Sequence, residues 1–263
     1  MPISKLLISF SNLKGVPLIP NYSLNINDII IYKIYLPDFI NLKSELDKFL
    51  SITEINRAER FHKELDKNQF IICRSILKIV LAAHTKLEAK NIQLDYNFNK
   101  KPYLASHPSL HFNVSHSEDY AVIAISQTKI GVDIESISES FDFTNLLPDI
   151  FIDDEILEIQ NATNKKHAFY TSWTRKEALV KALGKGIDED FKNIPCLDGE
   201  HNVDSNLFQT TENWQVYSFD LAEQYLAAVA FEGLSKISKN LVLFTIPNTI
   251  EGLLELSQIK KFN

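Results

Sequence analysis

Two carboxylates stand close together in the segment Gly131–Glu135, which reads GVDIE. Side chains two residues apart on a β-strand share a face, so Asp133 and Glu135 are expected to point the same way. Val132 and Ile134 would then face the core. Two neighbouring acids repel each other unless a cation lies between them, and oxygen-only ligands of this kind suit Mg²⁺ or Mn²⁺. A solvated acidic face on an edge strand is the alternative interpretation.

A second group of reactive side chains lies in the segment Trp173–Lys181, which reads WTRKEALVK. If the segment is helical, Trp173, Glu177 and Lys181 follow one another at intervals of four and line one face. An indole on the same face as an acid and a base indicates a partly buried, functional face. The alternative is an ordinary surface pair between Glu177 and Lys181, worth roughly 0.2–0.5 kcal/mol.

The segment Phe112–Ser117, FNVSHS, carries a third group. Its hydroxyls and imidazole, from Ser115, His116 and Ser117, offer hydrogen bonds to a phosphate, and a protonated imidazole adds charge. The alternative is a turn whose hydroxyls cap the local backbone. A Ser–His nucleophile pair is disfavoured, because adjacent residues on a strand face opposite ways.

Basic residues form a fourth, scattered group. A solvated charged face explains each of them, and a phosphate-rich partner would need a local basic patch. In chain order they are Arg57, Arg60, Lys63, Lys67, Arg74, Lys78, Lys100 and Lys101.

The elements that must position these groups have clear patterns. Apolar residues recur at intervals of three and four over residues 66–86, which predicts a helix with one buried face. The other predicted elements are a helix at 153–161, a helix at 166–183 that ends at Gly184 and Gly186, and strands at 120–125, 130–135, 214–219, 225–231 and 241–246.

A weak internal repeat relates two parts of the chain. Phe70–Lys78 and Phe169–Glu177 both open with Phe near the start of a long predicted helix, and each is followed by an apolar strand. Two related α/β halves, at 1–127 and 128–263, are therefore predicted, with a ligand cleft between them. Chance recurrence of a helix-then-strand pattern is the alternative.

Composition restricts the class of protein. The chain has 263 residues and a formal net charge of −7, from 27 basic and 34 acidic residues, so no general surface for nucleic acid is expected. Its two cysteines are too few for a disulfide scaffold and are typical of a reducing compartment. We find no signal peptide and no run of about 18 apolar residues. A cytoplasmic protein that does not enter a membrane is expected.

Four segments in chain order resemble the motif series of the 4′-phosphopantetheinyl transferases, of the monomeric type that activates surfactin synthetase. Together the motifs cover roughly residues 57–190. The combination of G-x-D-x-E with W-x-x-K-E-A, a further lysine and G-K-G is specific to this series. The segments are KKPY at 100–103, FNVSHS at 112–117, IGVDIE at 130–135 and FYTSWTRKEALVKALGKG at 169–186.

The resemblance implies an activity and a fold. The activity is transfer of the phosphopantetheine arm of coenzyme A to a serine of an apo acyl, peptidyl or aryl carrier protein, with release of 3′,5′-ADP. Such carriers serve fatty acid, polyketide or nonribosomal peptide biosynthesis. The implied fold is α+β, a monomer of two similar subdomains related by a pseudo-twofold axis, with coenzyme A and Mg²⁺, or Mn²⁺, between them.

The resemblance also implies roles for the acidic residues and for one lysine. Asp133, Glu135 and Glu177 match the metal-binding acids of the family. Glu177 is in addition the implied general base, acting directly or through a metal-bound water. Lys181 matches a lysine near the α-phosphate of coenzyme A, where it would stabilise or protonate the departing 3′,5′-ADP.

Binding of coenzyme A is implied for five further residues. Ser115 and His116 match the motif that grips its phosphates. Lys101 matches the lysine of a G-K-P motif, although the residues before it depart from the family's pattern. Arg74 corresponds to an arginine of the first long helix that faces the nucleotide. Lys78 stands where a second arginine is frequent, and lysine keeps the charge but loses the bidentate geometry.

Two other functions could use the same residues. A metal-dependent diphosphate hydrolase would need no carrier, but such enzymes place several acids in one helical motif. A family member that binds without transferring is disfavoured by the complete set of acids and Lys181.

Because carriers are usually acidic, this acidic chain should meet its partner through a local basic or apolar patch, for which Arg57, Arg60 and Lys63 are candidates.

Overall fold

The computed structural model describes residues 2–18, 25, 28–233 and 240–258. Its strands are β1 (Ile3–Phe10), β2 (Gly15–Pro17), β3 (Asp28–Tyr35), β4 (Asp95–Tyr96), β5 (Pro102–Tyr103), β6 (His111–Ser117), β7 (Tyr120–Ser126), β8 (Ile130–Ser136), β9 (Gly199–Asp204), β10 (Trp214–Ala222), β11 (Tyr225–Glu232) and β12 (Asn240–Thr245). Its α-helices are α1 (Lys43–Leu46), α2 (Ile52–Ala58), α3 (Glu64–Ala83), α4 (Leu147–Ile150), α5 (Asp153–Asn161), α6 (Lys165–Leu183), α7 (Ser205–Phe208) and α8 (Ile250–Gln258).

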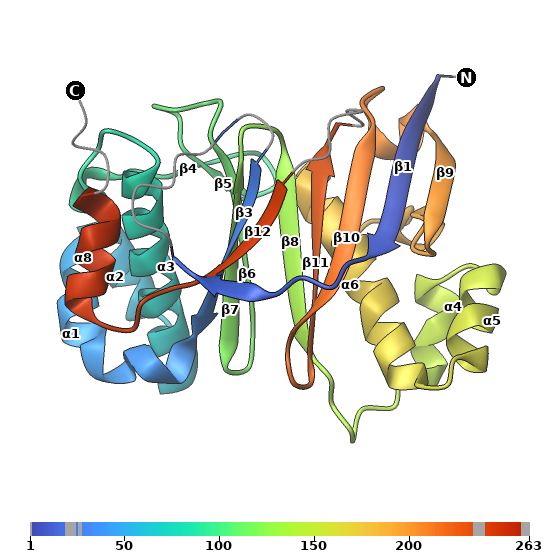
Figure 1. The fold of residues 1–263 in the computed structure, drawn as a ribbon, viewed down its shortest axis with the longest axis horizontal. Helices are drawn as coiled ribbons and strands as arrows, with labels where there is room; N and C mark the ends of the chain where they lie inside the picture. The colour runs from blue at the N-terminus through green and yellow to red at the C-terminus, as the bar shows by residue number, and fades with distance from the viewer. Residues whose placement is uncertain (1, 19–24, 26–27, 234–239, 259–263) are drawn as a thin grey trace.

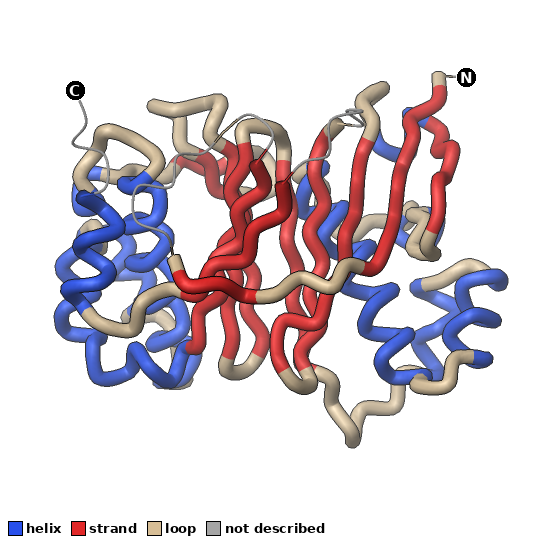
Figure 2. Tube along the Cα trace, viewed as in Figure 1, coloured by secondary structure: helices blue, strands red, loops and turns tan. Residues whose placement is uncertain are grey.

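Two sheets stand side by side at the centre of the molecule, and helices flank them (Figures 1 and 2). Within the described ranges, one five-stranded sheet has the order β8–β11–β10–β1–β9 and the other β2–β12–β3–β7–β6, while β4 and β5 form a separate ribbon. The long helix α3 covers the outer face of one sheet, and α6 covers that of the other. The fold is therefore α+β with two similar halves, as predicted.

A central apolar core joins the two sheets. Val132 and Ile134 of β8 lie in it together with Val122 and Ala124 of β7, all nearly inaccessible to solvent. The predicted alternation along β8 is thus confirmed: its apolar side chains point to the other sheet. Its other face, with the side chains of Asp133 and Glu135 and the bare backbone of Gly131, is turned to α6.

The two ends of the chain exchange places between the halves. β1 lies in the sheet of the second half, parallel to β10, and β12 lies in the sheet of the first half, parallel to β3. β1 also pairs with β9, so hydrogen bonds on both of its edges are satisfied there. The structure therefore differs from the contiguous halves 1–127 and 128–263 at both ends of the chain. A boundary near residue 127 stays a prediction.

The strongly patterned elements occur where they were predicted. α5 has the predicted bounds, α6 begins one residue early, and Gly184 ends α6 with a left-handed φ of 74°. α3 ends three residues before the predicted position. Just beyond its end, the Thr85 hydroxyl accepts a hydrogen bond from the Leu87 N–H, a local contact that competes with the helical ladder.

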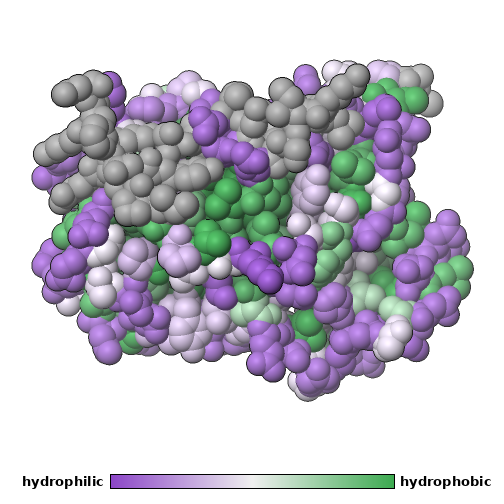
Figure 3. Space-filling view, in the orientation of Figure 1, coloured by the Kyte–Doolittle hydropathy of each residue, from purple (hydrophilic) through white to green (hydrophobic). Residues whose placement is uncertain are grey.

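The surface is predominantly polar around both groups of helices. Figure 3 shows apolar side chains gathered near the middle of one face, over the strands, with polar side chains toward the two helical ends. In the part of the chain that the structure describes, no helix combines the length and the apolar character needed to cross a membrane.

Candidate active site

The candidate site lies where β6 and β8, the edge strands of the two sheets, run beside each other. The Ser115 hydroxyl donates a hydrogen bond to Asp133 Oδ1 at 2.9 Å. Two residues further on, the Ser117 hydroxyl donates to Glu135 Oε2 at 3.2 Å. Two serines on one face of β6 therefore meet two acids on one face of β8, so side chains connect the two sheets at this seam.

Helix α6 closes the seam from the side of the second half. Lys181 Nζ lies 2.5 Å from Asp133 Oδ1 and 3.1 Å from Ser115 Oγ. The Trp173 indole N–H donates to Glu135 Oε1 at 3.3 Å. The helix face that carries Trp173 and Lys181 thus turns toward the acids of β8, and the alternative of an ordinary surface pair does not hold.

Glu177 lies between these two residues on the same face of α6. Burial, followed by the charge of Asp133, raises the pKa of Glu177 to about 7, although Lys181 opposes this effect. Burial and the charge of Asp133 also raise the pKa of Glu135. The three acids are therefore coupled electrostatically, and an added positive charge among them would favour their ionised forms.

The Asp133 carboxylate shows whether these acids suit a divalent metal. Oδ1 is bound by Ser115 and Lys181, whereas the buried Oδ2 has no hydrogen-bond partner among the described residues. Such an oxygen is costly to bury unless it gains a ligand, and an oxygen-only donor set suits Mg²⁺. Asp133, Glu135 and Glu177 therefore fit magnesium in their chemistry.

The acids are not gathered into a finished metal site in this conformation. Within the described ranges, no three His, Cys, Asp or Glu side chains lie close enough together to hold an ion. The ammonium of Lys181 supplies the positive charge beside Asp133 instead. The metal-binding role of the three acids stays a prediction, and Asp133 Oδ2, without a partner among the described residues, is the oxygen that Lys181 leaves available for it.

A pocket of about 460 Å³ lies against α3 and is called the α3 pocket below. His116 lines it, because His116 points away from the face of β6 that carries Ser115. Arg74 lines it from α3, together with Arg57 and Phe70. Arg74 and His116, two of the residues predicted to bind coenzyme A, are thus brought together, while Ser115 belongs to the acidic seam.

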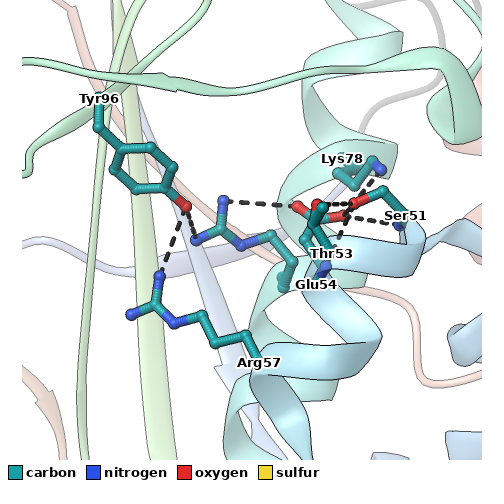
Figure 4. Close-up of polar contacts among 7 residues, drawn as sticks. Ser51, Thr53, Glu54, Arg57, Lys78 and Tyr96 are labelled. Carbon is teal, nitrogen blue, oxygen red and sulfur yellow. Dashed lines mark hydrogen bonds and ion pairs between the residues drawn. The ribbon is translucent and has the colours of Figure 1, made fainter.

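Lys78 does not reach the α3 pocket. Its side chain is fully buried, and its Nζ lies 3.1 Å from Glu54 Oε2 of α2 (Figure 4). A desolvated ammonium needs a carboxylate of this kind, and Glu54 supplies it from a different helix. In this structure the Lys78 side chain therefore faces Glu54 and not the α3 pocket, and its contact with coenzyme A stays a prediction.

Lys101 is also turned into the protein. Its Nζ donates hydrogen bonds to the backbone carbonyls of Ile130 at 2.8 Å, Lys181 at 2.6 Å and Ala182 at 3.5 Å. Carbonyls in the last turn of a helix have no partner within it, so Lys101 caps α6. Burial lowers the pKa of Lys101 to about 8. The contact of this ammonium with coenzyme A stays a prediction, while the contact that the structure shows is with these carbonyls.

Replacing Lys101 by Met should therefore destabilise the protein. The variant keeps the length of the side chain but leaves partly buried carbonyls without a donor, so we expect the free energy of unfolding to fall by about 2 kcal/mol. Urea denaturation measures this change. Lys100 is its exposed neighbour, and Lys100→Met is the matched control, with an expected change below about 0.5 kcal/mol. Equal losses in both variants would contradict the capping role.

A second pocket, of about 620 Å³, lies on the other side of the acids and is called the α6 pocket. Glu135 stands at one end of it, and Trp173, Phe169 and Phe191 form apolar walls. Phe169 and Trp173 are stacked, with ring centroids 6.4 Å apart. The acids are thus flanked by a basic and aromatic pocket on α3 and by an apolar pocket on α6.

Two residues of this region were not identified from the sequence. Asn113 accepts a hydrogen bond from the Val132 N–H at 2.8 Å. It lies two residues from Ser115, so the alternation of strand β6 would have indicated it. Ser117 is predicted from the sequence to donate a hydrogen bond to a phosphate, and its hydroxyl donates to Glu135 here. Tyr96 contacts Arg57 and Arg74, and no local pattern signals that contact.

Comparison with known proteins gives a consistent result. A family model described as the 4′-phosphopantetheinyl transferase superfamily matches residues 129–230, and one described as 4′-phosphopantetheinyl transferase, N-terminal, matches residues 42–128. The 4′-phosphopantetheinyl transferase HetI of Nostoc sp. is 31% identical over 224 residues, which are 83% of this chain and 93% of the relative. The 4′-phosphopantetheinyl transferase Sfp of Bacillus subtilis is 26% identical over 168 residues, 60% of this chain and 71% of the relative. The human L-aminoadipate-semialdehyde dehydrogenase-phosphopantetheinyl transferase is 25% identical over 203 residues, 67% of this chain and 65% of the relative.

Proposed function

Since the chain belongs to the 4′-phosphopantetheinyl transferase superfamily and is an enzyme of that class, we propose that its donor is coenzyme A and its acceptor a serine of an apo carrier protein. The second product is 3′,5′-ADP, and the reaction needs Mg²⁺, which Mn²⁺ could replace. The observation that carries the proposal is the seam at which Ser115, Asp133 and Lys181 bind one another. It joins both halves of the molecule at one cluster of acidic and basic groups.

The proposed reaction exchanges the phosphoanhydride bond of coenzyme A for a phosphate ester bond to the carrier serine. The serine oxygen of the carrier forms a bond to the β-phosphorus of coenzyme A, and the bond from that phosphorus to the bridging oxygen breaks. The non-bridging oxygens on the two phosphorus atoms of the diphosphate carry negative charge throughout the reaction. Positioning of the reactants and neutralisation of this charge therefore dominate the catalysis. A magnesium ion held by Asp133, Glu135 and Glu177 would supply positive charge to the diphosphate.

Glu177 and Lys181 have complementary roles in this proposal. Glu177 accepts the serine proton, and burial beside Asp133 raises its pKa to about 7 in the absence of a metal ion, a value that suits a general base at neutral pH. A magnesium ion bound to the same carboxylate would lower this pKa. Lys181 moves from Asp133 to the α-phosphate and stabilises the departing 3′,5′-ADP. The contact of 2.5 Å between Lys181 and Asp133 supports this role, because it places the ammonium beside the acids at which the diphosphate is proposed to bind.

The two flanking pockets suit the two ends of coenzyme A. The α3 pocket offers Arg57, Arg74 and His116 to the charged nucleotide, and Phe70 to its base. The α6 pocket offers mainly apolar walls, which suit the uncharged pantetheine arm. The diphosphate between these ends would then lie at the acids of β8.

The acceptor would approach the exposed side of the first half. Arg60 and Lys63 are exposed there and remain candidates for contact with an acidic carrier. Arg57, the third candidate, lines the α3 pocket and lies over the ring of Phe70 at 5.1 Å, so we assign it to the nucleotide instead.

The function is tested by incubating the protein with coenzyme A, Mg²⁺ and a panel of apo carriers from fatty acid and peptide synthesis. Intact mass spectrometry should show a gain of one phosphopantetheine on at least one carrier, and replacing Mg²⁺ by EDTA should abolish it. No gain on any carrier would refute the transferase proposal. Release of 3′,5′-ADP without a carrier would favour a diphosphate hydrolase instead.

A further inference from the structure

We propose that Glu54 is a positioning residue that holds the guanidinium of Arg74 in the α3 pocket, an inference that rests on the proposed binding of coenzyme A there. Glu54 lies outside the motifs that resemble the family, in the first turn of α2. Its carboxylate is the group that binds Arg74 and the buried Lys78 at the same time.

Glu54 is itself held in place by its own helix. The Ser51 N–H donates to Glu54 Oε2 at 2.8 Å, and the Glu54 N–H donates to Ser51 Oγ at 3.3 Å, which is a complete capping box (Figure 4). The Glu54 side chain is only 13% exposed. A carboxylate with its backbone and side chain both fixed can define the position of the groups that bind it.

Its two partners both come from α3 and are also buried. Lys78 Nζ lies 3.1 Å from Oε2, and Arg74 Nη1 lies 3.7 Å from Oε1. The Arg74 side chain is 10% exposed, and Nη1 has no hydrogen-bond partner among the described residues, so the carboxylate is its nearest anchor. Each oxygen of Glu54 thus faces a different cation.

Arg74 and Arg57 both line the α3 pocket, and their guanidinium groups meet at the Tyr96 hydroxyl. Both donate to the Tyr96 hydroxyl, Arg74 at 3.2 Å and Arg57 at 3.5 Å, and both lie over the ring of Phe70. Two guanidinium groups that share one neutral oxygen repel each other. Glu54 offsets this repulsion for Arg74, so the side chain stays in the pocket before an anionic ligand arrives.

The same device occurs in the second half of the molecule. Glu155 occupies the same position in the first turn of α5, accepts a hydrogen bond from the Ile152 N–H, and lies 2.8 Å from Nζ of the fully buried Lys176 on α6. In each half, an acid at the start of a short helix therefore fixes a buried lysine of the long helix. In the second half the neighbour of that lysine is Glu177, a residue of the proposed site.

The test uses the double variant Glu54→Gln/Lys78→Met. Glu54→Gln alone would leave a buried ammonium without its partner and would endanger the fold. The double variant removes one negative and one positive charge, so the local net charge is unchanged and a kinetic effect reports the orientation of Arg74. We expect the KM for coenzyme A to rise about tenfold, equivalent to about 1.4 kcal/mol, with kcat within twofold of wild type.

Three further comparisons make the result specific. In an Arg74→Ala background the double change should alter KM less than twofold, because a residue that acts through Arg74 has no effect without it. Glu64→Gln, which breaks an exposed ion pair with Lys43 at the start of α3, is the matched control and should leave KM unchanged. Glu54→Asp keeps the charge but shortens its reach, so KM should rise at least threefold.

A KM within twofold of wild type in the double variant would overturn the inference. An undiminished tenfold rise in the Arg74→Ala background would overturn it as well. These failures differ from a failure of the proposed function, in which the wild-type protein itself would transfer no phosphopantetheine to any carrier.

Discussion

Replacing Glu177 by Gln is expected to lower the kcat of phosphopantetheine transfer about a thousandfold, within the range of a general acid–base residue. Gln keeps the size of the side chain but can neither accept the serine proton nor bind a metal as a carboxylate. Steady-state transfer to an apo carrier, followed by intact mass, measures the effect. Glu177→Ala should likewise abolish transfer, since it also removes the carboxylate.

The fold of this variant should remain intact. Burial raises the pKa of Glu177, which means that its charged form is disfavoured in the folded protein. Gln carries no charge to desolvate, so the midpoint of thermal unfolding should not fall. Glu223→Gln, in the exposed turn between β10 and β11, is the matched control and should retain full activity. Turnover near the wild-type rate in Glu177→Gln would mean that the site is misplaced.

The acidic seam was predictable because it depends on local periodicity. The alternation of Ile130–Glu135 put Asp133 and Glu135 on one face, and the structure has them there, with Val132 and Ile134 in the central core. The interval of four along α6 likewise put its reactive residues on one face. The periodicity of side chains is a property of a single strand or helix. It can therefore be recognised in the sequence without knowing which element packs against it.

The two halves resemble each other more clearly in structure than in sequence. The two apolar strands that follow the long helices, β7 and β11, begin with Tyr120 and Tyr225. These two rings lie against each other, with centroids 4.6 Å apart and nearly perpendicular planes. Equivalent positions of the two halves therefore meet between the sheets, a relation that the spacing along the chain does not reveal.

The exchange of the terminal strands had no local signal. β1 pairs with β10 through contacts such as Ile8 with Val216, more than 200 residues apart in the chain. An apolar strand pattern states that a segment will be buried in a sheet, but not in which sheet. The number of strands with which a segment could pair grows with the separation along the chain that is allowed, and only the complete fold selects one of them.

The contacts that the structure shows for Lys78 and Lys101 also had no local signal. A lysine in a helix or turn is usually solvated, and both resemble phosphate ligands by position. Their real partners, the Glu54 carboxylate and the carbonyl groups at the end of α6, belong to segments far from them in sequence. Charge type was therefore predictable, whereas the direction of the side chain depended on tertiary contacts.

Replacing Gly131 by Ala is expected to reduce the free energy of unfolding by about 3 kcal/mol, the upper part of the range for an overpacked core. A Cβ at this position would lie 2.1 Å from the Ala178 carbonyl oxygen and 2.2 Å from the Ala182 backbone nitrogen. Both atoms belong to the backbone of α6, so no side chain can rotate to make room. The whole of α6 must therefore shift away from β8. Urea denaturation measures the resulting decrease in the free energy of unfolding.

The control for this variant is Gly186→Ala, just beyond α6. A Cβ there would meet nothing within 4 Å, so stability should change by less than about 0.5 kcal/mol. The clash at Gly131 also predicts that adding Ala182→Gly gives no rescue, because the obstructing atoms are the backbone nitrogen and Cα of Ala182 rather than its methyl group. Rescue by that change, or unchanged stability of Gly131→Ala, would contradict the close approach of helix and strand.

Transfer activity should fall in Gly131→Ala beyond the loss of stability. Glu177 and Lys181 precede Ala178 and Ala182 on the helix, and Asp133 follows Gly131 by two residues on the strand. Any movement that relieves the clash therefore separates the proposed base and lysine from the acid of β8. A misplacement of about 1 Å can cost about a hundredfold in rate, so we expect a kcat loss of that order under conditions in which the variant is fully folded. The glycine that lets α6 touch β8 would then be required for the chemistry as well as for the fold.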